Sequence, residues 1–384
     1  MFFAALTPLL PGYAEQFDLS KAGAGVLQAA YPLGALVGSL PSGYAAARFG
    51  AKPTAVTALA LIAGTSLVFG VADSIVVLDL ARFVQGFAGA CAWTATFTWL
   101  VRQAPAERRG QLIGTVLGLA IAGALFGPVL GGLGSLLGTG PVFGAVGLVS
   151  LAVAGLALAT AAPPPGGTQP IAEVTRALRD RRLLGGLWLV MLPGLLFGTL
   201  TVLAPLRLAD LGVSAVGIGA VFLTATTLEA LVSPIMGRVS DRRGTRYAIT
   251  IALIASAIGC ALLLWPERAA ALVPIAVFAA CAFSMFWTPA MSLLSVSAER
   301  VGLEVAWIFA LSNMAWAPGQ GVGSAAGGAL ARVTADAVPY LLLAGCCVVT
   351  LAAVRRASSH ATPAGTVEDA GLVATRSELV ELEE

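Results

Sequence analysis

The sequence contains little charge. Asp, Glu, Lys and Arg make up only 11% of its 384 residues, whereas 58% are hydrophobic and the mean hydropathy is +0.89. Because soluble globular proteins carry about 25% charged residues, this composition excludes an ordinary water-soluble domain and is typical of a chain that faces lipid. The formal net charge of +2 is too small to indicate a nucleic-acid partner, and we expect none.

Lysine, histidine and paired cysteines are scarce. Neither Lys21 nor Lys52 is followed by Ser or Thr, so no loop of the type that cradles ATP is present. The single histidine, His360, lies beyond the last apolar run, which argues against a histidine metal centre or an intramembrane enzyme. The five cysteines lie in apolar runs and are expected to pack there, although Cys346 and Cys347 leave a redox or metal site as an alternative. We predict no cofactor and no metal.

Long apolar runs fill most of the chain. About 20 apolar residues form a helix that crosses a bilayer core about 30 Å thick. Eleven such runs are present: 22–47, 54–72, 75–101, 112–137, 142–162, 183–206, 215–237, 247–265, 269–297, 305–331 and 338–354. A twelfth run, 1–10, ends before Pro11 and Gly12 and is too short to cross alone. We therefore predict an all-α membrane protein of twelve helices whose first helix is truncated, with more apolar residues and a basic residue upstream.

The chain repeats itself. The equivalent pairs are Gly43 and Gly237, Arg48 and Arg242, Gly50 and Gly244, Lys52 and Arg246, Trp93 and Trp287, and Thr94 and Thr288, all 194 residues apart. A glycine set follows at an offset of 196: Gly127, Gly131 and Gly132 with Gly323, Gly327 and Gly328. Two equivalent helix bundles related by an axis are the architecture of transporters that alternate access to a central site.

The repeat and the loops define four segments. We predict a six-helix half at 1–162, a cytoplasmic linker at 163–182, a second six-helix half at 183–356 and a disordered acidic tail at 357–384. In the linker, Pro170 can open a short helix that carries Ile171, Val174 and Leu178 on one side, and this helix is expected on the membrane surface.

Basic residues are concentrated on one side of the predicted bundle. If the loop with Arg48 and Lys52 is cytoplasmic, that side holds 17 of the 22 Lys and Arg residues. Cytoplasmic loops are enriched in these residues, so the pattern predicts a multi-pass protein of the cell membrane, bacterial in type, with both termini cytoplasmic once the first helix is complete.

The run from Gly237 to Arg246, GRVSDRRGTR, resembles the loop signature of the major facilitator superfamily. A weaker copy lies at the equivalent place in the first half. In that family the loop latches the two halves on the cytoplasmic side, so the resemblance implies gating roles for Gly43, Arg48, Gly50, Gly237, Asp241, Arg242, Gly244 and Arg246. Ala47 stands where the first copy would carry its acid, which weakens that latch.

A second resemblance lies in the fifth predicted helix. Its residues Gly114, Gly123, Gly127, Pro128, Gly131 and Gly132 look like the motif associated with antiporters of this superfamily. Glycines four residues apart make a groove for close helix contact, and a proline removes one backbone hydrogen bond. A glycine groove also occurs in membrane helices of other functions.

Few charges lie inside the apolar runs. Arg82, with Gln85 and Gly86, matches the family's pattern in the fourth helix, and a charge near the bilayer centre costs about 2.5 to 3.5 kcal/mol. We expect Arg82 to face the cavity, although pairing with Asp79 would make both structural. Glu229 has no basic neighbour in its own helix, so we predict that it is the main proton-coupling acid and that Arg82 modulates it; a packing role for Glu229 is the alternative.

These patterns together predict a twelve-helix permease of the major facilitator type. We expect a monomer that uses protons to export a small, partly apolar compound, with the bilayer as its surroundings. The predicted cavity residues are Gln85, Trp93, Trp287, Asn313, Trp316 and Gln320, although the aromatic residues could equally serve packing. An uptake symporter and a non-transporting sensor or scaffold are the alternatives.

The missing acid at Ala47 generates a test of the latch. We expect Asp241→Ala to impair transport, because this remaining acid carries more of the cytoplasmic closure, whereas Ala47→Asp is tolerated or tightens the closed gate. The measurement is the accessibility of a cysteine placed on the cytoplasmic side. Equal accessibility in the two variants would contradict the latch.

Overall fold

The computed structural model describes residues 2–103, 109–162, 171–303 and 305–359, and every regular element within them is an α-helix. The helices are α1 (Phe2–Gln16), α2 (Lys21–Arg48), α3 (Ala51–Val71), α4 (Ile75–Gln103), α5 (Arg109–Leu137), α6 (Thr139–Ala159), α7 (Ile171–Ala177), α8 (Arg181–Asp210), α9 (Ala215–Arg243), α10 (Thr245–Leu262), α11 (Ala269–Ser284), α12 (Trp287–Arg300), α13 (Val305–Val333) and α14 (Ala337–Ser359). The predicted acidic tail, with His360, lies outside the described residues.

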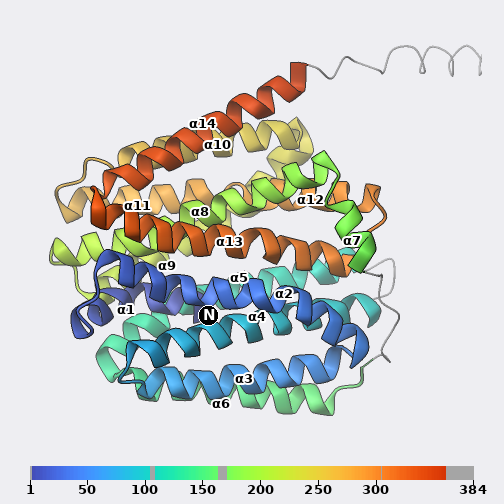
Figure 1. Ribbon diagram of the computed structural model, residues 1–384, viewed down its shortest axis with the longest axis horizontal. Coiled ribbons are helices and arrows are strands. Elements are labelled where there is room, and N and C mark those ends of the chain that lie inside the picture. Colours follow the sequence, from blue (N-terminus) through green and yellow to red (C-terminus); the bar gives the residue numbers. More distant parts are fainter. Residues whose placement is uncertain (1, 104–108, 163–170, 304, 360–384) are drawn as a thin grey trace, which may run out of the picture.

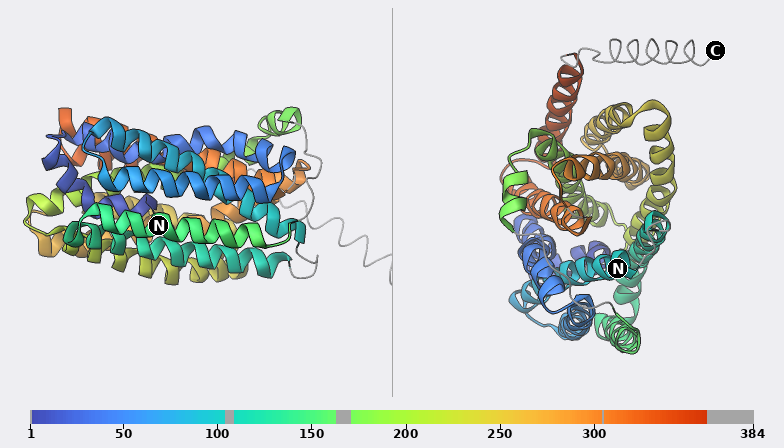
Figure 2. Two further views of the ribbon diagram at one scale, coloured as in Figure 1. Left: turned by 90° about the horizontal axis from the view of Figure 1, so that it is seen from below. Right: turned by 90° about the vertical axis from the view of Figure 1, so that its right-hand side faces the viewer.

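The architecture is a twelve-helix bundle in two halves, as the sequence predicts. Nine helical segments in the described residues are long and apolar enough to cross a membrane, one of them formed by α11 and α12 together. Helices α1, α5 and α13 complete the twelve. In Figure 1 the first half, blue to green, occupies the lower part of the bundle and the second half, yellow-green to red, the upper part, and Figure 2 shows the same division along the helix axes.

The first helix does not end where the sequence predicted. Helix α1 continues through Pro11 and Gly12 to Gln16, so its 15 residues extend about 22 Å. A proline removes one helical hydrogen bond. Packing offsets this loss, because Leu6 and Leu10 are fully buried and Tyr13 packs edge-on against Phe69.

The tenth crossing is interrupted. Instead of one run, α11 ends at Ser284 and α12 begins at Trp287. Pro289 explains the break, because it has no N–H to donate to the carbonyl of Met285 and its ring crowds that carbonyl. The interruption places Trp287 at the start of a new helix.

The linker helix packs on protein. In α7, Val174 is 3% exposed and Ala177 is 6% exposed, and Leu178, just beyond it, packs against the same core. The predicted apolar side is therefore present and buried, and Leu178 lies beside residues of α8 and α13.

The two ends of the bundle differ. At one end, which we call the basic end, Lys52 donates to the carbonyls of Leu158 and Thr160, and Gln103 donates to Ala161, which ties α3, α4 and α6 together. The other end, which we call the opposite end, carries the α1–α2, α3–α4 and α13–α14 connections (Figure 1).

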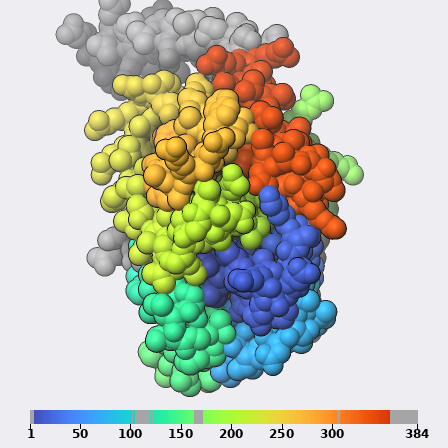
Figure 3. Space-filling model, turned by 90° about the vertical axis from the view of Figure 1, so that its left-hand side faces the viewer, coloured from blue at the N-terminus to red at the C-terminus, as the bar shows by residue number. Residues whose placement is uncertain are grey.

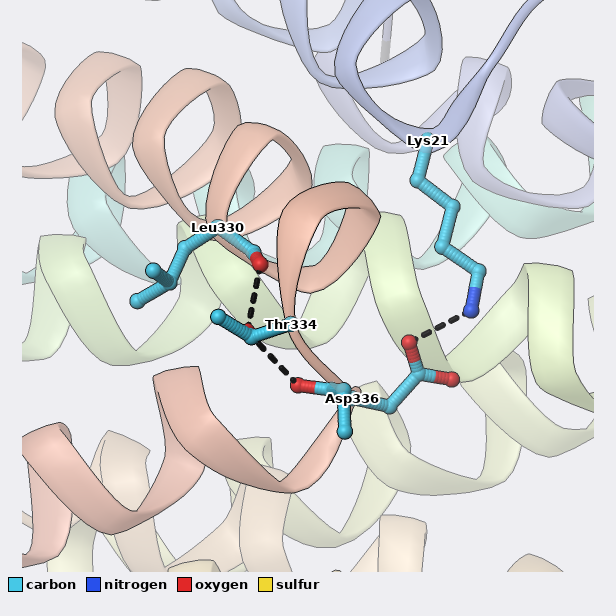
Figure 4. Close-up of polar contacts among 5 residues, drawn as sticks. Lys21, Leu330, Thr334 and Asp336 are labelled. Carbon is cyan, nitrogen blue, oxygen red and sulfur yellow. Dashed lines mark hydrogen bonds and ion pairs between the residues drawn. The ribbon is translucent and has the colours of Figure 1, made fainter.

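The halves close against each other at the opposite end. Lys21, the first residue of α2, pairs with Asp336, just before α14, at 2.5 Å between Nζ and Oδ1 (Figure 4). The start of α2 also contacts the end of α13, where a Cβ on Gly25 would collide with the Ser324 backbone. Figure 3, which looks at this end, shows blue and teal atoms of the first half in contact with lime and orange atoms of the second.

Glycines set the distance between α2 and α4. A Cβ on Gly34 would collide with the carbonyl of Phe83, and one on Gly86 would collide with the carbonyl of Tyr31. Lipid provides no hydrophobic drive for helix association, so this backbone contact is what holds the two helices together.

We therefore expect Gly86→Ala to lower the unfolding temperature of the protein in detergent, because the new methyl group forces the helices apart at a cost of about 1–3 kcal/mol. Gly155→Ala in α6 is the matched control, since a Cβ there meets no atom within 4 Å. The control should be neutral or slightly stabilising. Equal unfolding temperatures for the two variants would disprove the role of this contact.

The Lys21–Asp336 pair predicts a bias toward closure of the opposite end. Asp336→Asn should open this end more often, by at most about fivefold because a half-exposed pair contributes up to about 1 kcal/mol. The readout is alkylation of a Thr201→Cys cavity reporter by an impermeant reagent added at the opposite end, in a background without the native cysteines.

The charge swap Lys21→Asp with Asp336→Lys should restore closure, and Asp73→Asn, an exposed acid at the same end, should leave it unchanged. Alkylation of the Asp336→Asn variant at the rate of the parent protein would exclude the bias.

Candidate functional site

A cavity of about 550 Å³ lies between the two halves. The first half contributes Ala4 and Thr7 of α1, Trp93 of α4, and Ala120, Ala124 and Pro128 of α5. The second half contributes Pro193, Phe197, Thr201, Phe222, Thr226, Glu229, Ser233, Phe283, Ser284, Trp287, Thr288, Met291, Trp316 and Gln320. The wall is thus mostly apolar and aromatic, with a few polar groups, which is the usual character of a small-molecule site.

Four of the six predicted cavity residues lie on this wall. They are Trp93, Trp287, Trp316 and Gln320. Gln85 and Asn313 are not among the lining residues, which corrects their predicted position. Gln85 is only 1% exposed on α4, so its side chain is enclosed within the first half. On α13 it is Trp316 that forms the wall, and not Asn313, which lies three residues earlier.

The repeated Trp-Thr pair has the same role in both halves. Each tryptophan lines the cavity. Thr94 is hydrogen-bonded to Ser42 of α2 at 2.9 Å, and Thr288 to Ser233 of α9 at 2.9 Å. The threonine therefore fixes its helix to a neighbour, and this anchors the indole beside it at the cavity.

Glu229 is the single charged residue among the described lining residues. No ion pair or hydrogen bond of its carboxyl occurs within the described part of the chain. Cys281 of α11 is close enough to interact with it electrostatically. A carboxyl group buried without a cationic partner is costly as an anion, so it is stable when it carries a proton or when a ligand supplies a positive charge.

Arg82 does not line the cavity, contrary to the sequence prediction. Its side chain is 1% exposed, and its guanidinium lies 5.1 Å from the centre of the Tyr31 ring on α2. The tight α2–α4 contact encloses it within the first half, where a cation over an aromatic face is stabilised. Asp79, one turn earlier, is half-buried and close enough to Arg82 to interact with it electrostatically.

The glycines of α5 pack on two partners. A Cβ on Gly131 would collide with Ala5 and Pro8 of α1, and Gly132 lies against Val216 of α9 in the other half. The repeat is symmetric: Gly327 packs on Thr199 of α8, and Gly328 on Lys21 of α2. In each pair of glycines, the first packs against a helix of its own half and the second packs against a helix of the other half. Pro128 of the same motif lines the cavity, and the side chains of residues 109–118, 121 and 122 in α5 are outside the description.

The predicted gating residues lie at the basic end. Gly244 and Gly50 both have positive φ, 88° and 98°, and each separates two consecutive helices with a single sharp turn. Helix α9 runs six residues past its predicted end, so Asp241 and Arg242 belong to its last turn. Both are exposed, and neither makes a hydrogen bond or ion pair in the described residues of this conformation.

The sequence reading missed an aromatic contact between the halves. Phe97 of α4 stacks on Phe309 of α13, with ring centres 4.2 Å apart, and Trp93 packs on Phe97 at 4.7 Å. In the sequence, the one feature that indicates a role for Phe97 is its spacing of one helical turn from Trp93. The stack lies on the basic side of Trp93 and closes that part of the interface.

Sequence comparisons agree with this geometry. The family model described as Major Facilitator Superfamily matches residues 1–319 and 191–381. An uncharacterized MFS-type transporter of Yersinia pestis (strain Pestoides F) is 26% identical over 93% of this chain and 92% of its own length. A probable sugar efflux transporter of Helicobacter pylori (strain G27) is 27% identical over 48% of this chain and 47% of its length. The MFS-type transporter ppzB of Metarhizium rileyi (strain RCEF 4871) is 28% identical over 35% of this chain and 29% of its own length.

Solved structures share the fold. The partially occluded, inward-open xylose transporter XylE from E. coli is similar with a TM-score of 0.70 at 16% identity, over 91% of this chain and 94% of that one. The nucleoside transporter NupG gives 0.69 at 15% identity, over 92% and 94%. With the family model matched across the chain, two six-helix halves and a cavity between them, this protein belongs to the major facilitator superfamily.

Proposed function

We propose that this protein is a secondary active transporter that exports a small, partly apolar compound in exchange for protons. The observation that carries the proposal is the position of Glu229: a carboxyl without a cationic partner, at the interface of two halves that can move against each other. Proton exchange needs one group that takes a proton from one side and releases it to the other, and Glu229 is the single ionisable group on the described wall.

The conformation supports alternating access as the mechanism. If the basic end is cytoplasmic, in the cell membrane, the closure at Lys21–Asp336 is on the outer side. Opening to the outside then requires this contact to break and the basic end to close. The exposed Asp241 would engage in that second state, and Arg82 would act on Glu229 only indirectly, since the two are not on the same wall.

Export is the direction that the residues favour over uptake. The glycines of α5 match the antiporter-like motif and make the contacts that let α5 pivot between α1 and α9. Among relatives, one is named a probable sugar efflux transporter and another, of Mycobacterium tuberculosis (strain CDC 1551 / Oshkosh), a multidrug resistance protein B homolog, 34% identical over 24% of this chain. A monomer holds the complete cavity, so we propose no oligomer.

The role of Glu229 predicts a separation of two activities. In proteoliposomes, Glu229→Gln should lose flux driven by an imposed proton gradient, at least about 100-fold, because the amide cannot exchange a proton. Substrate counterflow, which needs no net proton movement, should persist.

Glu299→Gln, which removes an exposed carboxyl on α12, is the matched control and should transport normally. Unchanged driven flux in Glu229→Gln would reassign Glu229 to packing. Flux with the opposite coupling sign would make the protein an uptake symporter, and no flux of any compound would favour a sensor or scaffold.

A further inference from the structure

We infer that the ligand of the cavity is a monovalent organic cation, an apolar aromatic amine in its protonated form, whose ammonium group binds Glu229. This inference rests on the proposed function and names its substrate class. Three properties of the cavity carry it: its charge, the direction of its hydrogen-bonding groups and its aromatic walls.

The charge of the described wall is that of one carboxyl group. No Lys or Arg lies among the described lining residues, and Arg82 is enclosed behind Tyr31. Among the α5 residues whose side chains are not described, 109–118, 121 and 122, the sequence has one charged residue, Arg109, the first residue of the helix. An anionic ligand would therefore meet Glu229 without compensation, whereas a single positive charge would satisfy it.

Three hydroxyl groups of the wall offer lone pairs rather than protons. Thr201 donates its proton to the Phe197 carbonyl at 2.8 Å, Thr226 to the Phe222 carbonyl at 2.8 Å, and Ser284 to the Cys281 carbonyl at 2.8 Å. These bonds occupy the donor of each hydroxyl and leave its oxygen able to accept. A ligand that donates hydrogen bonds is favoured over one that accepts them.

Gln320 strengthens this bias. Its side chain is fully buried, its amide nitrogen donates to Thr201 at 3.4 Å, and its Oε1 has no partner. A buried amide oxygen without a partner is costly unless a ligand donates to it. Among the fully buried polar atoms of the described wall residues, Trp93 Nε1 is also without a partner.

The remaining wall fits an aromatic cation. Trp93, Trp287, Trp316 and Phe283 present π-faces and apolar edges, which bind both an aromatic ring and the positive charge beside it. A neutral polyol such as a sugar would need donors as well as acceptors from the wall, and its hydroxyl groups would face aromatic carbon.

The test is equilibrium binding to the detergent-purified full chain, measured by calorimetry with four probes of one shape. These are 1-naphthylmethylamine, its N,N,N-trimethyl derivative, 1-naphthylmethanol and 1-naphthoate. At neutral pH the first two are cations, and only the first donates N–H bonds. We expect the amine to bind at least about 30-fold more tightly than the alcohol, the trimethyl cation to be intermediate and the carboxylate not to bind.

Two variants separate charge from folding. Glu229→Gln should remove the preference for the amine over the alcohol, whereas Glu299→Gln should keep it, and both should show the unfolding temperature of the parent protein. Equal binding of the alcohol or the carboxylate would overturn the inference, as would a preference for the amine retained in Glu229→Gln. A trimethyl cation as tight as the amine would overturn the acceptor argument.

The outcome is separable from that of the proposed function, because binding in detergent involves no gradient. A protein that binds the amine through Glu229 but drives no proton-linked flux refutes the proposed function and retains the ligand class. A proton-driven exporter that binds the alcohol best refutes the ligand class alone.

Discussion

Close backbone contact between helices is the constraint on which this bundle depends. In lipid, apolar side chains give helices no reason to associate, so van der Waals contact must hold them together. Gly34 and Gly86 bring α2 against α4, and Gly194 and Gly319 bring α8 against α13 in the same reciprocal way, each at a point where a Cβ would strike backbone. Each half therefore contains a helix pair whose glycines leave no room for looser packing.

Besides the close glycine contacts of α2 with α13, two contacts of a different kind join the halves. Lys21 and Asp336 form a half-exposed ion pair at the opposite end, and Phe97 and Phe309 stack nearer the basic end. A surface pair contributes up to about 1 kcal/mol and an aromatic pair about 0.5–1.5 kcal/mol. Contacts of this size can break and re-form, which is what a protein that alternates access requires.

Glu229 is the one ionisable group on the described wall of the cavity. Apolar and aromatic side chains surround Glu229, and the nearby hydroxyls already donate to their own helices. In such surroundings the carboxylate anion is unfavourable unless it takes up a proton or binds a ligand cation. This burial therefore makes Glu229 suited to exchange a proton or to bind a cation.

The sequence by itself determined the class, the helices and the two halves, because a bilayer demands long apolar helices and a repeat marks equivalent bundles. It also identified Trp93, Trp287, Trp316 and Gln320, whose polar or aromatic atoms are unusual in apolar runs. It could not tell which side of a helix faces the cavity: Arg82 and Gln85 turn into the first half, while Glu229 faces the cavity. Only the tertiary structure decided this, because the packing of one glycine-bearing helix on another, and not the residue's own polarity, sets the rotation of each helix.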